Sequence, residues 1–132
     1  MKLNHLILLV SLISIISATT ECTFNVDPEP PASPSDIVVT PSDSKVEIVW
    51  NFNNEPDFEG YNLYKSDQAI GDIQELTPVN ESVFTDTTFV DEEVANGTTY
   101  YYRITSVDLN GNESSPSRQI QVTPFAPPPS RP

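Results

Sequence analysis

This sequence of 132 residues lacks most of the side chains on which common catalytic and metal sites depend. It contains one histidine, His5, and one cysteine, Cys22. Because His5 lies in a segment that we expect to be removed, the mature chain should have no imidazole for Ser-His-Asp catalysis, Cys-His catalysis or metal ligation. A single cysteine forms neither an internal disulfide nor a thiolate metal cluster. We therefore expect no cofactor and no metal site.

Basic side chains are also scarce, with 6 against 19 acidic ones and a net charge of −13 at pH 7. Nucleic acids and anionic lipid surfaces attract proteins whose Lys and Arg side chains replace the counterions of the phosphates. The sequence therefore argues against a nucleic-acid partner and against direct electrostatic binding to a membrane.

The N-terminal segment has the organisation of a secretory signal peptide. Lys2 precedes a twelve-residue apolar stretch, residues 6–17, which is followed by small residues. A helix that spans a membrane needs about 20 apolar residues, so this stretch is too short. We predict a signal peptide at residues 1–18, cleavage within 18–21, and a secreted or cell-envelope protein. The alternative is a buried N-terminal helix or an uncleaved anchor, although the run is apolar on all sides rather than amphipathic.

Cys22 closely follows the apolar stretch and heads a proline-rich acidic segment, an arrangement that resembles a bacterial lipoprotein tether. Lipidation of Cys22 would give the protein a membrane attachment. However, Thr19 and Glu21 stand where lipoprotein signals favour leucine and a small residue. We favour a secreted protein whose Cys22 thiol is free or paired with another chain, and lipidation stays an alternative.

Prolines mark the predicted limits of one folded domain. Nine of the 13 prolines lie in residues 27–34 and 124–132. Such composition favours extended spacers. We predict a proline-rich acidic linker at residues 19–33, a domain at 34–124 and a proline-rich tail at 125–132.

Inside these limits, apolar residues alternate with polar ones and turn residues recur about every ten positions, which predicts an all-β domain. In the segment 45–52, for example, Val46, Ile48 and Trp50 share one face. We expect strands at 37–40, 45–52, 60–65, 84–91, 98–107 and 118–123, with a weaker segment at 74–79.

The chain from about residue 31 to 124 resembles the fibronectin type III family. The resemblance rests on Trp50, on residues 60–64, on residues 94–100 leading into Tyr102 and Ile104, and on the closing segment 111–117. It implies a seven-stranded, two-sheet Greek-key sandwich with an immunoglobulin-like fold. The structural residues that it implies are Trp50, Tyr61, Leu63, Tyr100, Tyr102 and Ile104. Tyr100 would be the tyrosine-corner residue, its hydroxyl bonded to the backbone near Val94.

Two sets of acidic and amide side chains could suggest chemistry, but each has a simpler interpretation. Asp108, Asn110 and Asn112 alternate as in a calcium loop, yet they depart from the EF-hand pattern, and Asn-Gly is a strong turn dipeptide. Carboxylates also gather in two clusters, where a pair could in principle hydrolyse glycosides. These clusters lie at predicted turns and strand ends, so we expect solvated carboxylates and no catalysis. Their members are Glu55, Asp57 and Glu59, and Asp86, Asp91, Glu92 and Glu93.

One face of the predicted sandwich could bind a partner. Tyr64, Tyr101 and Arg103 are predicted to face away from the core on neighbouring strands, where they could stack on a sugar or anchor a protein. Mutual packing of cross-strand neighbours on the solvent face is the alternative.

We predict a non-catalytic interaction or spacer module that meets an extracellular protein or glycan. A carbohydrate-associated accessory module is the alternative, and a carboxylate-based hydrolase is a remote one. Asn80, Asn96 and Asn112 begin Asn-x-Ser/Thr sequons, but this composition yields such sequons by chance, so they do not establish glycosylation.

Overall fold

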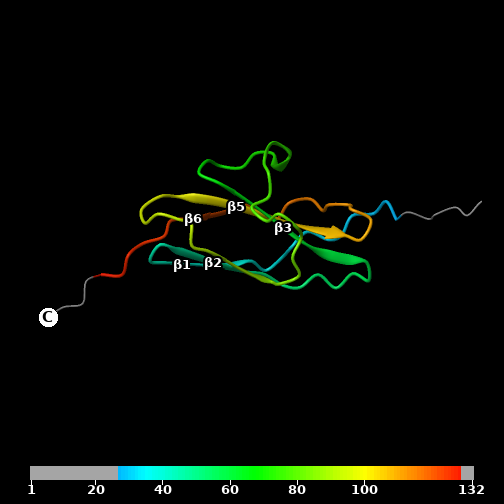
Figure 1. Ribbon diagram of the computed structural model, residues 1–132, viewed down its shortest axis with the longest axis horizontal. Helices are drawn as coiled ribbons and strands as arrows, with labels where there is room; N and C mark the ends of the chain where they lie inside the picture. Colours follow the sequence, from blue (N-terminus) through cyan, green and yellow to red (C-terminus); the bar gives the residue numbers. More distant parts are fainter. Residues whose placement is uncertain (1–26, 129–132) are drawn as a thin grey trace, which may run out of the picture.

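Two antiparallel sheets pack face to face in the computed structural model, which describes residues 27–128 (Figure 1). The predicted signal peptide, Cys22, the linker up to residue 26 and the tail from residue 129 lie outside the described residues. No helical segment between residues 27 and 128 is long and apolar enough to cross a membrane.

The first sheet has the strand order β1-β2-β4 and the second β3-β5-β6. Their bounds are β1 (Val38–Ser42), β2 (Lys45–Val49), β3 (Phe58–Ser66), β4 (Thr88–Asp91), β5 (Tyr100–Asp108) and β6 (Ile120–Val122). The predicted all-β two-sheet sandwich is confirmed, but residues 27–128 form six strands instead of seven.

The core lies between the sheets because each strand turns one set of alternate residues inward. Val46 and Ile48 of β2 are fully buried, and Trp50 just after β2 is 3% exposed. The Trp50 ring meets Tyr61 of β3 edge-on, with centroids 5.3 Å apart. Leu63, Tyr102 and Ile104 are also fully buried.

The segment predicted as a weak strand at 74–79 is not a strand. Ile73–Glu75 is a short 3-10 turn whose N-terminus is capped by the Asp72 side chain. Beyond it, the side chain of Asn80 takes the place of a strand backbone beside β3: its Oδ1 accepts from the Leu63 amide at 2.9 Å, and its Nδ2 donates to the Tyr61 carbonyl at 3.2 Å. The side-chain amide of Asn80 thus shares the edge of β3 with two backbone partners: the Val79 amide donates to the Leu63 carbonyl, and Phe84 forms an antiparallel bridge with Tyr61.

The tyrosine corner implied by the family resemblance is formed. Tyr100 is half-buried at the start of β5, and its hydroxyl accepts a hydrogen bond from the Ala95 amide at 3.0 Å. The turn before β5 is also tied to the end of the domain, because the Gly97 amide donates to the carbonyl of the buried Pro124 at 2.9 Å.

The described chain enters and leaves at opposite ends of the long axis (Figure 1). At the entrance, the backbone is held by the domain rather than free. Asn53 Nδ2 and the Ser106 hydroxyl both donate to the Ala32 carbonyl, and the Ser33 hydroxyl donates to the Ser115 carbonyl at 2.6 Å. Residues 31–33, which the sequence prediction assigns to the linker, therefore contact the sandwich.

Candidate functional site

The three residues of the predicted binding face come together, but they do not form an open surface. Tyr64 and Arg103 are direct cross-strand partners on β3 and β5, and Tyr101 lies two residues before Arg103 on the same face. This face is the outer one of the second sheet, as predicted. Yet Tyr64 is only 4% exposed, and Tyr101 and Arg103 are half-buried.

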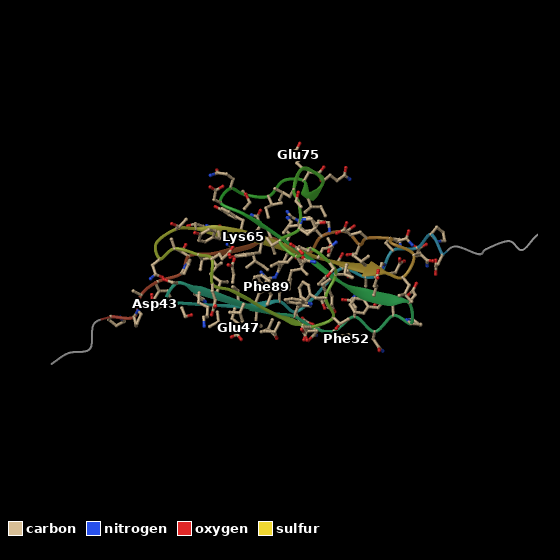
Figure 2. The ribbon with its side chains drawn as sticks, viewed as in Figure 1. Asp43, Glu47, Phe52, Lys65, Glu75 and Phe89 are labelled. Carbon is tan, nitrogen blue, oxygen red and sulfur yellow. The ribbon has the colours of Figure 1, made fainter. Side chains whose placement is uncertain are left out.

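A covering loop, residues 67–79, contacts Arg103 on this face. It leaves the end of β3 and stands above β5 in Figure 1, with Glu75 at its tip in Figure 2. Ile70, which is 5% exposed, anchors it: the Ile70 amide donates to Gln119 Oε1 at 2.7 Å, and its carbonyl accepts from Arg103 Nη2 at 3.3 Å. The prediction that Tyr64 faces solvent is wrong, because Tyr64 is buried and its hydroxyl bonds to Glu113 of the β5–β6 connection, while the covering loop is anchored on Arg103 and Gln119.

Arg103 is occupied by the backbone that covers it. Its Nη2 holds Ile70, its Nη1 donates to the Ser117 carbonyl at 3.2 Å, and its Nε is buried without a hydrogen-bond partner in the described residues. A guanidinium that bridges two loops in this way pins them to β5. It is not presented as a free cation for an incoming ligand.

The Tyr64 hydroxyl belongs to a closed polar cluster with Glu113. It donates to Glu113 Oε1 at 2.7 Å, and the same oxygen accepts from Thr105 Oγ1 and from Asn62 Nδ2. Burial, together with the bond to the carboxylate, raises the pKa of Tyr64 to about 12. Tyr64 therefore stays a neutral phenol at physiological pH and fixes the β5–β6 connection to the sheet.

The calcium-like sequence forms a turn whose carboxylate is used internally. Asp108 is fully buried, and its Oδ1 accepts from the amides of Asn110 at 2.9 Å and Asn112 at 2.8 Å, while its Oδ2 accepts from Asn112 Nδ2 at 2.8 Å. Burial acts to raise the pKa of Asp108, but these hydrogen bonds outweigh it and hold the pKa below its usual value. Within residues 27–128, no group of three or more acidic, cysteine or histidine side chains is arranged to hold a metal ion.

The acidic clusters are divided among separate structural contacts. Glu55 Oε1 accepts from the Ala32 amide at 2.9 Å, and Glu92 pairs with Lys45 at 3.1 Å on the surface. Asp91, at the end of β4, pairs with Lys65 of β3 at 2.7 Å and accepts from the Tyr102 hydroxyl at 2.8 Å. Asp91 is thus a tie between the two sheets.

The Asp91 environment does not suit a general acid. Burial acts to raise its pKa, but hydrogen bonds from Lys65, the Tyr102 hydroxyl and the Glu93 amide outweigh that effect and leave the pKa lowered. A carboxyl that protonates a leaving group needs a raised pKa. Asp91 instead remains ionised and bound to Lys65, which also donates to the Glu93 carbonyl at 2.8 Å.

The side-chain amides of all three sequon asparagines donate hydrogen bonds within the domain. Asn80 Nδ2 donates to carbonyls of β3 and of its own turn, Asn96 Nδ2 donates to Asp43 Oδ1 at 2.6 Å, and Asn112 Nδ2 donates to Asp108 and to the Asp27 carbonyl. These amides hold turns together, so attaching a glycan to the folded domain would cost those contacts.

Sequence reasoning missed the residues that join distant segments. The Lys65–Asp91 pair links residues on different sheets, and Figure 2 labels Lys65 between Glu75 and Phe89. Likewise, Asn53, Ser106 and Asn112 hold the entering backbone. No local pattern marks these side chains, because their partners lie far away along the chain.

Known proteins include relatives of this chain in sequence. No protein-family profile matches the sequence. Similar segments occur in the amylopullulanases of Thermoanaerobacterium thermosulfurigenes and Thermoanaerobacterium saccharolyticum, each 36% identical over 97 residues and covering 74% of this chain. The match spans only 5% and 7% of those two enzymes, so this chain corresponds to a small part of each.

Several solved structures share the fold. An Fn3-like protein from Clostridium thermocellum is 25% identical, with a TM-score of 0.57, and the match covers 78% of this chain and all of that one. The fibronectin type-III domain of a human protein gives a TM-score of 0.59 at 15% identity, covering 78% of this chain and 94% of that one. A β-1,2-glucanase from Parabacteroides distasonis matches at 21% identity and a TM-score of 0.57, over 76% of this chain and 14% of that chain.

Proposed function

This chain belongs to the fibronectin type III family, and from that premise we propose that it is a non-catalytic module that spaces and positions other parts of a carbohydrate-active enzyme system outside the cell. Fold alone does not supply a function, so the proposal depends on how this particular domain is connected.

The observation that carries the proposal is the path of the chain through the domain. The backbone enters at one end of the long axis and leaves at the other (Figure 1). A hydrogen bond from Asn53 to the Ala32 carbonyl and one from Ser33 to the Ser115 carbonyl hold the entering segment, and the bond from the Gly97 amide to the Pro124 carbonyl holds the departing segment. A sandwich held in this way at both ends would keep whatever is joined to its two ends at a set distance, as a spacer does.

The association with carbohydrate-active enzymes rests on the relatives. Amylopullulanases carry a segment that is 36% identical to this one, and a β-1,2-glucanase contains a domain of the same fold. Export is part of the proposal, since the N-terminal sequence has the organisation of a secretory signal. The surroundings of Tyr64, Arg103 and Asp91 favour a structural role over catalysis or sugar stacking, because all three are engaged inside the domain.

Spin labels at the two ends test the spacer proposal. With Cys22→Ser as the background, Asp27→Cys and Pro128→Cys place one label at each end, and pulsed dipolar spectroscopy measures the distribution of distances. We expect one narrow distribution. Asn112→Ala, which removes the bond from Nδ2 to the Asp27 carbonyl, should broaden it, whereas Asn110→Ala, whose side chain makes no hydrogen bond in the described residues, should not. A broad distribution in the parent domain would overturn the proposal.

Two further assays separate the spacer from its alternatives. In affinity electrophoresis through gels that contain pullulan or amylopectin, the domain should migrate as it does without polysaccharide. Slower migration in the presence of either polysaccharide would contradict the spacer proposal and identify the domain as a glycan-binding module. Incubation with pullulan should release no reducing sugar above buffer, and sustained release by the purified domain would make it an enzyme.

A further inference from the structure

The chain contains two Asn-Gly pairs whose glycines have nearly the same φ angle. Gly97 and Gly111 have φ angles of +80° and +82°, and each follows an asparagine, Asn96 or Asn110. Both glycine amides donate one backbone hydrogen bond, Gly97 to the Pro124 carbonyl at 2.9 Å and Gly111 to the Asp108 carbonyl at 3.0 Å. Since glycine has no Cβ, neither main-chain nitrogen is shielded by a side chain of its own residue.

The two asparagines differ in what holds their side chains. Asn96 is restrained at both ends of its amide: its Oδ1 accepts from the Ser44 amide at 2.8 Å, and its Nδ2 donates to Asp43 Oδ1 at 2.6 Å. Asn110 is exposed, and within residues 27–128 its side-chain amide makes no hydrogen bond. The Asn110 side chain is therefore free to turn toward the next residue, and that of Asn96 is not.

We propose that Asn110-Gly111 is a site of spontaneous covalent modification, in which this exposed asparagine converts to aspartate and isoaspartate while Asn96 is protected. The Gly111 nitrogen attacks Asn110 Cγ and forms a C–N bond. The side-chain nitrogen leaves as ammonia, taking up the proton that the Gly111 nitrogen loses. Water then adds to either carbonyl of the resulting succinimide, and opening of the ring yields aspartate or isoaspartate. The only co-reactant is water.

The isoaspartate product changes the turn that holds the entering chain. It adds one methylene to the backbone between residues 110 and 111, and so displaces Asn112 relative to Asp108. The Asn112 amide and Nδ2 both donate to the Asp108 carboxylate, and Nδ2 also donates to the Asp27 carbonyl at 2.7 Å. Hydrogen bonds weaken steeply with misalignment, so the lengthened turn should release both the carboxylate and the N-terminal segment. This inference does not depend on the proposed function.

Peptide mapping by mass spectrometry tests the selectivity. The full chain is incubated in mildly alkaline buffer at 37 °C, and conversion at the two sites is followed by the mass gained when NH2 is replaced by OH. Two ordinary hydrogen bonds restrain Asn96, so we expect conversion at Asn110 to be about 30-fold faster. Asp43→Ala removes one restraint and should accelerate conversion at Asn96 without affecting Asn110. Equal rates at the two sites in the parent, or faster conversion at Asn96, would overturn the proposal.

Hydrogen exchange tests the structural consequence separately. The isoaspartate form, isolated by chromatography, should lose protection at the Asn110 and Asn112 amides, which both donate to Asp108 Oδ1. Asn110→Asp is the matched control, because it carries the same new charge with a backbone of normal length and should retain that protection. Equal loss of protection in both would assign the effect to charge and overturn the account based on backbone length.

Discussion

Replacing Asp91 with asparagine should destabilise the domain by about 2–3 kcal/mol, because it removes the charge that neutralises Lys65 between the sheets. Removing one partner of a buried ion pair costs about 3–5 kcal/mol. The Asp91 side chain is 6% exposed but that of Lys65 is 20% exposed, so water relieves part of the penalty. Asparagine keeps the size of the side chain, but its single carbonyl oxygen can accept from either the Tyr102 hydroxyl or the Glu93 amide, so the loss combines the charge with one hydrogen bond.

The sole tryptophan, Trp50, provides the assay. It is 3% exposed in the core, so its fluorescence should report unfolding in urea, and linear extrapolation gives the free energy of unfolding. Glu92→Gln is the matched control, since the Glu92–Lys45 pair is exposed at 69% and 45% of its side chains and should contribute less than about 1 kcal/mol. If Asp91→Asn and Glu92→Gln cost the same, the reasoning about burial is refuted.

A double-mutant cycle assigns the loss to the pair. Lys65→Met keeps the apolar stem of the side chain and removes its charge, leaving Asp91 with the Tyr102 hydroxyl and the Glu93 amide. The sum of the losses of stability in Asp91→Asn and Lys65→Met should exceed the loss in the double variant by at least about 1 kcal/mol. Once one charge of the pair has been removed, removing the other no longer breaks the ion pair. Strictly additive losses would show that the two side chains act separately.

The same contacts make the contribution of Asp91 depend on pH. The pKa of Asp91 is lowered in the folded domain, although burial opposes that shift, because Lys65, the Tyr102 hydroxyl and the Glu93 amide stabilise its charged form. Its stabilising contribution is therefore fully present above the unfolded value of about 3.9 and is lost as the pH falls through the folded pKa. The difference in stability between the parent and Asp91→Asn should be constant from pH 6 to 5, which is about two to one units above that value, and shrink below about pH 4. A difference that grows on acidification would contradict the assigned sign.

Three smaller perturbations probe other parts of the fold by urea unfolding. Gly60→Ala should cost about 1–3 kcal/mol, since its Cβ would lie 2.9 Å from the Phe84 carbonyl oxygen, and no loss would mean that this segment yields freely. Tyr100→Phe should cost about 1 kcal/mol through the lost corner hydrogen bond, whereas Tyr101→Phe, whose hydroxyl makes no hydrogen bond in the described residues, should be neutral. Asn80→Ala should cost about 1–3 kcal/mol and speed amide exchange along the edge of β3, and unchanged exchange would contradict its role as a strand substitute.

Patterns within one strand were sufficient to predict much of the core. The alternation of Val46, Ile48 and Trp50 identified the buried face of β2, because successive side chains of a strand point to opposite faces. The same reasoning separated Leu63 from Tyr64 correctly by face. It could not tell which outer face would be covered, because the covering loop is anchored at Ile70 by Arg103 and Gln119, residues more than 30 positions away.

The candidate site was predicted less well than the fold for the same reason. Tyr64, Tyr101 and Arg103 were correctly placed on one face, but their accessibility depended on how the segment after β3 folds. Seven strands were expected, with a weak segment at 74–79, and the structure instead places the Asn80 side chain and the backbone of Val79 and Phe84 beside β3. Exposure depends on the sum of all neighbours, and a period of two describes only the strand itself.

The β periodicity, the core faces and the turns of this protein could be predicted from the sequence alone, since each depends on residues a few positions apart. Which polar side chains link distant segments could be seen only in the tertiary structure. These links are Asp91 with Lys65, Glu113 with Tyr64, and Asn112 with Asp27. These partners are separated by 26, 49 and 85 positions, so only the packing of one sheet on the other and the return of the chain bring them within hydrogen-bond distance.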